Sequence, residues 1–139
     1  MRVARASGLT AIVLSFTLVA CSGSTGSTTP TAPARPRSPA KLTIVSPKNG
    51  QVIHGSTVPI RVRLQNARIV PATTADIVPD EGHLHVYIDD QLVSMNFGLT
   101  DDVSDVAPGL HVLKVEFVAS DHLPFNPRVI VQEAFEVRA

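Results

Sequence analysis

The sequence predicts an all-β domain over residues 41–139, built as an antiparallel β-sandwich of about seven strands. Short runs rich in Val, Ile, Leu and Phe alternate apolar with polar residues, as strands with one buried face do. Gly, Pro, Asn and Asp separate these runs at turns. Beyond the N-terminal segment, no window has the i, i+3, i+4, i+7 apolar spacing of an amphipathic helix. These 99 residues are enough for one domain.

In the first half of the domain, the sequence predicts two strands and a long loop. Residues 41–45 form the first strand, and a turn follows at residues 46–50. Residues 57–64 form the second, because aliphatic residues there alternate with proline and arginine. Residues 65–81 have a mixed composition, which predicts a loop with an edge strand near residues 67–70.

The second half predicts four strands, at residues 83–89, 92–97, 110–119 and 128–137. A tight turn at residues 89–91 joins the first two into a hairpin. The next connection is predicted as an acidic loop carrying Asp101, Asp102 and Asp105. It lacks the Asp-x-Asp-x-Asp-Gly spacing of an EF-hand loop, which favours a solvated loop over a calcium site.

Three short pieces resemble bacterial Ig-like and fibronectin-III-like modules of secreted proteins. They are Ser46-Pro47-Lys48-Asn49-Gly50, Val86-Tyr87-Ile88-Asp89-Asp90 and Pro108-Gly109-Leu110-His111. The resemblance implies an Ig-like sandwich and concerns the fold, because one fold hosts many functions. The Gly82-His83-Leu84-His85-Val86-Tyr87 run is also similar to small exported bacterial domains of uncharacterised role.

Residues 1–20 have the layout of a secretory signal peptide. Arg2 and Arg5 precede an apolar stretch that is too short to span a bilayer, for which about 20 residues are needed. Leu18 and Ala20 before Cys21 resemble the lipobox of bacterial lipoproteins. The resemblance implies cleavage before Cys21 and a diacylglycerol on its thiol. The membrane is then a partner, and the protein lies in the cell envelope, on the outer face of the cell membrane or at the outer membrane of a two-membrane organism.

Residues 21–40 are predicted to form a disordered tether after the lipidated cysteine. Pro, Ser, Thr and Gly dominate this segment, which cannot bury enough apolar surface to offset the entropy lost on ordering. Residues 41–139 then carry eight Lys and Arg against twelve Asp and Glu, a formal net charge of −4. Nucleic acid requires a concentrated basic face, so we exclude it as a partner. The expected protein partner is an unidentified envelope or extracellular protein.

His83 and His85 are the leading candidates for chemistry in the domain. They lie two residues apart on a predicted strand, so both point to one face while Leu84 and Val86 take the other. Two such imidazoles can share a metal ion. Alternatively, they occupy a solvated or partly covered sheet face and bond to neighbouring side chains.

A metal site would need further ligands beyond these two histidines. His122 and Met95 are the leading candidates, and Asp121 or Glu81 offers oxygen. Imidazole with thioether indicates copper, whereas imidazole with carboxylate suits zinc or other divalent ions. The possible cofactor is therefore a copper or zinc ion.

The sequence contains none of the common catalytic motifs that would indicate an enzyme. No serine stands in a Gly-x-Ser-x-Gly elbow, and neither a P-loop nor a dinucleotide fingerprint occurs. We therefore expect a non-enzymatic binding module at the cell envelope, with an exported metal-binding protein as the alternative. His111 shares its phase with Leu113 and Val115, which predicts a partly buried histidine with a backbone hydrogen bond.

Overall fold

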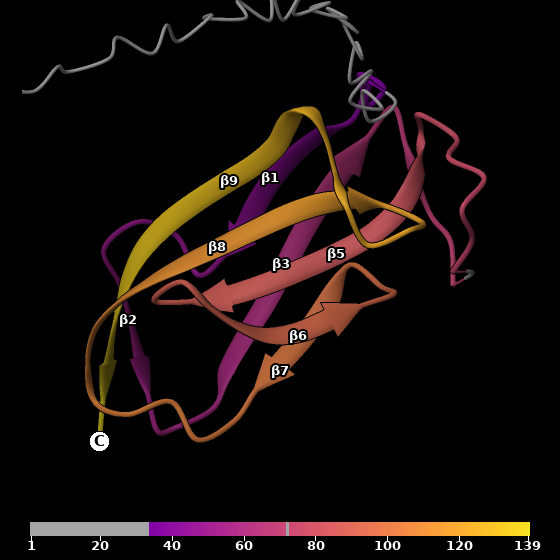
Figure 1. Ribbon diagram of the computed structural model, residues 1–139. Coiled ribbons are helices and arrows are strands. Elements are labelled where there is room, and N and C mark those ends of the chain that lie inside the picture. The colour runs from indigo at the N-terminus through magenta and orange to yellow at the C-terminus, as the bar shows by residue number, and fades with distance from the viewer. Residues whose placement is uncertain (1–33, 72) are drawn as a thin grey trace, which may run out of the picture. The chain divides into compact units, whose positions relative to one another are not determined.

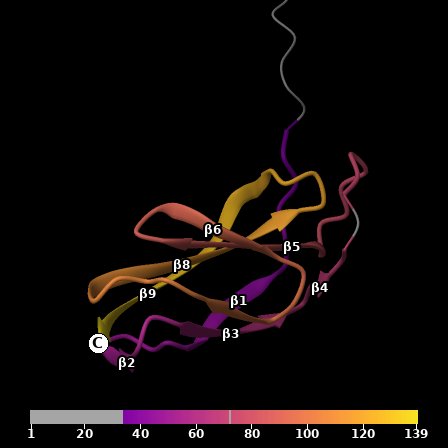
Figure 2. The ribbon, with the colours of Figure 1, turned by 90° about the horizontal axis from the view of Figure 1, so that it is seen from below.

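The computed structural model describes residues 34–71 and 73–139, which form two β-sheets packed face to face (Figure 1, Figure 2). The smaller sheet has the antiparallel order β1 (Lys41–Ser46), β3 (Val58–Gln65), β7 (Thr100–Val103). The larger sheet has the order β2 (Gln51–His54), β9 (Pro124–Arg138), β8 (Gly109–Ala119), β5 (Glu81–Ile88), β4 (Arg68–Ile69). Strand β6 (Gln91–Asn96) also pairs with β5, on the same edge as β4 but farther along β5, at residues 84–88. The predicted all-β sandwich is confirmed.

The core lies between the two sheets and follows the alternation in the sequence. In β3, Val58, Ile60 and Val62 are buried while the residues between them are exposed. From the larger sheet come aliphatic residues of β5 and β8, together with Phe117, Phe125 and Phe135. Burying one such side chain fully contributes roughly 1.5–3 kcal/mol, so this layer stabilises the sandwich.

Strand β5 is buried on both faces along most of its length, as is the C-terminal half of the neighbouring β8. Leu84 and Val86 point into the core, yet His83 and His85 are buried as well. Figure 1 shows β5 lying between β8 and β6, with both of which it forms antiparallel ladders. The histidine face is therefore the outer face of the larger sheet, covered locally by other parts of the chain.

The structure has nine strands in its described residues, where the sequence predicted about seven. Residues 51–54, for which the sequence predicted no strand, form β2 because they pair in parallel with the end of β9. The predicted acidic loop contains β7, because Asp101 and Asp102 pair with the edge of β3. The edge strand predicted near residues 67–70 is the two-residue β4, which runs parallel to β5. Thus the sandwich is antiparallel except at these two short pairings.

Residues before position 41 also contact the domain. Arg35, in the segment predicted as a tether, donates two hydrogen bonds to Asp121, at 2.6 and 2.9 Å. It also donates to the carbonyls of Leu123 and Pro124, and Asn126 N–H donates to the carbonyl of Pro36. The predictions for residues 1–20, for Cys21 and for residues 22–33 lie outside the described residues. Within residues 34–71 and 73–139, no helix is long and apolar enough to cross a membrane.

Gly82 allows the close approach of β5 and β8, which provides a test of this packing. A Cβ at Gly82 would lie 1.9 Å from the carbonyl oxygen of Val118. We expect Gly82→Ala to lower the free energy of unfolding by roughly 1–3 kcal/mol or more, measured by urea denaturation. In the matched control Gly98→Ala, the nearest atom is Asn96 Oδ1 at 3.3 Å, and we expect a change within about 0.5 kcal/mol. Equal stabilities for the two variants would contradict the packing described.

Candidate metal centre

Three histidine side chains converge on the outer face of the larger sheet. His83 and His85 project from β5, and His122 comes from the turn between β8 and β9. Nε2 of His83 lies 3.2 Å from Nε2 of His85 and 2.9 Å from Nδ1 of His122. One nitrogen from each ring lies within 4.8 Å of the other two. The structure thus brings together three of the four leading ligand candidates that the sequence suggested.

These spacings suit a shared ion. Imidazole nitrogens bind zinc at about 2.0–2.1 Å, so two of them on a tetrahedral ion lie roughly 3.3 Å apart. The distances of 2.9 and 3.2 Å in the structure differ from that value by a few tenths of an ångström. The third pair, from His85 and His122, lies within 4.8 Å, so side-chain rotations that bring it to the same spacing would place three nitrogens around one ion.

Hydroxyl groups contact the outer nitrogens of two of the rings. Tyr87 Oη lies 3.4 Å from Nδ1 of His85, and Thr73 Oγ1 lies 3.1 Å from Nε2 of His122. When these outer nitrogens donate their protons to the hydroxyls, the inner nitrogens present lone pairs toward one point. Such outer contacts are how proteins orient metal-binding histidines. Lys114 holds the Tyr87 ring in turn, with Nζ 4.4 Å from its centroid.

The turn that carries His122 is held in an unusual backbone conformation. His122 has a φ of 64°, in the left-handed region that non-glycine residues rarely adopt. His122 N–H donates to the carbonyl of Ala119, and the Asp121 carboxylate accepts the N–H of Leu123. Arg35 binds the same carboxylate, and this interaction holds the Asp121 pKa below its usual value. The turn is thus fixed where its histidine meets the other two.

Burial keeps the two strand histidines neutral. His83 is fully buried, and this burial, with the neighbouring His122 and His85, lowers its pKa to about 4. Burial and His122 also lower the pKa of His85, with a smaller opposing effect from Glu116. Neutral imidazole is the form that binds metal, so at pH 7 both rings are ready to act as ligands. Nδ1 of His83 is buried without a hydrogen-bond partner.

Met95, the fourth sequence-predicted ligand, lies on β6 directly opposite His85 in the ladder. Its side chain is 52% exposed. Phe97, which the sequence analysis did not single out, packs on His83 with ring centroids 4.8 Å apart. Its position two residues beyond Met95 in the predicted hairpin could have shown that both side chains lie on the face of the histidines. No sequence pattern pointed to Thr73 or Arg35. Thr73 contacts His122 from a loop of mixed composition, and Arg35 contacts Asp121 from the predicted tether.

The carboxylates suggested as oxygen donors are engaged elsewhere. Asp121 is bound by Arg35 through both oxygens, and Glu81 is paired with Arg68. Glu116, opposite His85 on β8, is buried and accepts bonds of 2.7 and 2.5 Å from Arg128. Among the described residues, no carboxylate or thiol joins the histidine group.

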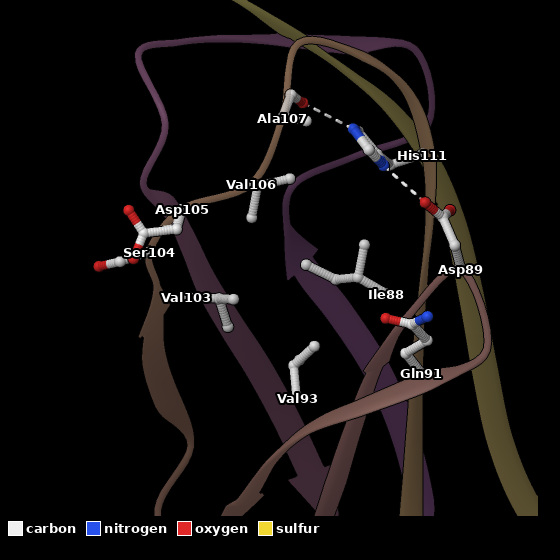
Figure 3. Close-up of a pocket in the computed structure, with 10 residues that line it drawn as sticks. All are labelled: Ile88, Asp89, Gln91, Val93, Val103, Ser104, Asp105, Val106, Ala107 and His111. Atoms are coloured by element: carbon white, nitrogen blue, oxygen red, sulfur yellow. Dashed lines mark hydrogen bonds and ion pairs between the residues drawn. The ribbon is translucent and has the colours of Figure 1, made fainter.

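Another histidine, His111, lies beside a cavity at the other end of β5. Figure 3 shows this cavity of about 270 Å³, with Asp89 and Ala107 bonded to the His111 ring. Nδ1 lies 2.7 Å from the Asp89 carboxylate, and Nε2 lies 2.8 Å from the Ala107 carbonyl. Burial opposes protonation, but these two bonds outweigh it and raise the His111 pKa. The predicted backbone hydrogen bond is confirmed, and with both nitrogens engaged His111 fastens the loop before β8 to the turn after β5.

A family of unknown function, DUF6130, has a model that matches residues 1–133 of the chain. The chain belongs to this family. No curated protein was found to match the sequence.

Solved structures give weaker likenesses. Fibronectin(III)-like modules of CbhA from Clostridium thermocellum are 17% identical with a TM-score of 0.45, over 69% of this chain and 93% of that one. The endo-β-1,4-mannanase from Thermotoga petrophila is 18% identical with a TM-score of 0.47, over 71% of this chain. An engineered protein is 12% identical with a TM-score of 0.47, over 72% of this chain. The chain spans 20% of each of the last two proteins, and the likenesses say nothing about the chemistry of the site.

The lowered histidine pKa values predict how stability changes with pH in metal-free protein. The unfolded chain protonates His83 near pH 6.5, whereas the folded state does so only near pH 4. Stability should therefore fall as the pH drops from about 6.5 to about 4, by on the order of 2–3 kcal/mol for this residue. The raised pKa of His111 contributes stability that is fully present below pH 6.5, so it does not oppose this trend.

Urea denaturation in the presence of a chelator at a series of pH values measures this effect. His83→Gln cannot titrate, so its stability should fall less steeply over this interval. The slope that remains belongs to His85, whose pKa is also lowered. Parallel pH profiles for the wild type and the variant would contradict the assignment.

Proposed function

We propose that this member of the DUF6130 family is an exported metal-binding protein whose His83, His85 and His122 bind one transition-metal ion, copper or zinc. The observation that carries the proposal is the convergence of three imidazole nitrogens within 4.8 Å of one another. A chance cluster of this kind is costly, because His83 is fully buried and keeps one nitrogen without a partner. An ion bound at the inner nitrogens would stabilise the cluster through bonds to Nε2 of His83, while Nδ1 of the same ring would keep no partner.

Binding, rather than catalysis, is the role that the surroundings of the site support. The three carboxylates nearest to it along the chain or across the sheet are held by arginines, so none is free to act as a general base. The rigid turn at His122 and the outer hydrogen bonds of the rings instead favour a stable ligand set.

A metal titration monitored by thermal unfolding tests the proposal. Because an ion that binds only the folded state stabilises it, Zn(II) or Cu(II) at 100 times its Kd should add about 2.7 kcal/mol. The double variant His83→Ala, His85→Ala should lose this increase in Tm. The matched control His54→Ala removes an exposed histidine outside the cluster and should keep it. If neither metal raises the Tm of the wild-type protein, the proposal is wrong.

We also propose that a lipid on Cys21 anchors the protein in the cell envelope. Leu18 and Ala20 before this cysteine, and the basic residues Arg2 and Arg5 ahead of the apolar stretch, support the proposal. Two acyl chains on one residue would give stable rather than marginal membrane binding.

Mass spectrometry of the protein purified from bacterial membranes tests the anchor. The mature chain should begin at a diacylglyceryl-modified Cys21 and partition into detergent. Cys21→Ser should leave an unmodified precursor, whereas the neighbouring Ser22→Ala should be processed normally. A mature N-terminus at any other residue would rule out this anchor.

A further inference from the structure

We propose that the thioether of Met95 is the fourth ligand of the histidine site and makes the site selective for Cu(I). This inference rests on the proposed function, because it takes metal binding by the three histidines as given. Three nitrogen ligands leave one position of a tetrahedral ion open. The described residues supply no carboxylate or thiol to the cluster, so the identity of the fourth group decides which ion the site prefers.

The register of β6 places Met95 on the correct face. Met95 is the direct partner of His85 in an antiparallel ladder, where opposite side chains share a face with Cβ atoms about 4.5–5.5 Å apart. The ring contact of Phe97 with His83 shows independently that this phase of the β6 chain faces the histidines. A methionine side chain at that separation is long enough to bring its sulfur to an ion held by the His85 ring.

The exposure of Met95 leaves it free to move. The side chain is 52% exposed and has three rotatable bonds, so no core contact must be broken for it to turn toward the site. Phe97 beside it is 45% exposed, and Leu123, next to His122, is 53% exposed. Met95 and Phe97 thus offer exposed soft or apolar side chains on the strand segment that faces the histidines.

The arginines around the site remove the competing oxygen ligands. Glu81, Glu116 and Asp121 are the carboxylates closest to the three histidines along the chain or across the sheet, and they are paired with Arg68, Arg128 and Arg35. Carboxylate oxygen favours harder ions, whereas thioether sulfur selects Cu(I). With the oxygens engaged and the sulfur available, the ligand set of three imidazoles and one thioether favours Cu(I) over Zn(II).

X-ray absorption spectroscopy and competition titrations of the full chain test this inference. The probes are Cu(I), supplied under anaerobic conditions from a chromophoric chelator of known affinity, and Zn(II). Wild-type protein with Cu(I) should show sulfur at roughly 2.3 Å from the metal, the length of a metal–sulfur bond. Met95→Leu keeps the volume and apolar character of the side chain but removes the sulfur. It should lose this sulfur signal and bind Cu(I) about tenfold or more weakly, with Zn(II) affinity changed less than about threefold.

A control and two contrary outcomes distinguish a failure of the Met95 role from a failure of the proposed metal site. Cys21→Ser should retain the sulfur signal, which excludes the only cysteine as its source. A Cu(I) environment of nitrogen alone, or equal Cu(I) affinity in wild type and Met95→Leu, would overturn the role of Met95 while leaving the histidine site intact. Failure of wild-type protein to bind either metal would instead overturn the proposed function and this inference with it.

Discussion

The two-sided burial of β5 is the constraint on which the rest of the structure depends. Its even-numbered residues, such as Leu84 and Val86, must face the core, because they hold the two sheets together. Strand geometry then sends His83 and His85 to the opposite face. A slip of one residue in the ladder with β8 would exchange these faces and bury imidazoles between the sheets. The contacts that stabilise the sandwich therefore also fix the direction of the histidines.

The outer face of the larger sheet buries imidazole and carboxylate groups, which are normally hydrated. Burial keeps His83 and His85 uncharged, while arginines neutralise the carboxylates around them. Buried polar groups cost free energy unless they have partners. Here His83 retains an unpartnered nitrogen, and His122 keeps a rarely adopted backbone conformation. Uncompensated features of this kind tend to occur where function has favoured them over stability.

Much of this arrangement was predictable where one residue pattern determines one structural feature. The alternation around Val58 and Ile60 identified β3, and the His-x-His spacing placed two imidazoles on one face. The short strands β2 and β7 were not predictable, because each exists through pairing with a distant strand rather than through its own pattern.

The convergence of His122 with the strand histidines depended on long-range structure in the same way. It requires the hairpin of β8 and β9 and the hold of Arg35 on Asp121, which no local signal reveals. The sequence offered His122 as one of several possible ligands. The structure narrows the choice, because Asp121 and Glu81 are engaged with arginines.

The position of Arg35 has a consequence for where the site would operate. Arg35 holds the turn that carries His122, and 13 residues of chain lie between it and Cys21. A fully extended chain spans at most about 3.3–3.6 Å per residue, so this stretch reaches at most roughly 50 Å. If Cys21 carries a lipid, the histidines stay within a thin layer above the bilayer. Confinement of this kind raises the effective concentration of the site toward other membrane-bound proteins. Exchange of an ion with such a neighbour would then be favoured by proximity, without any dedicated high-affinity interface.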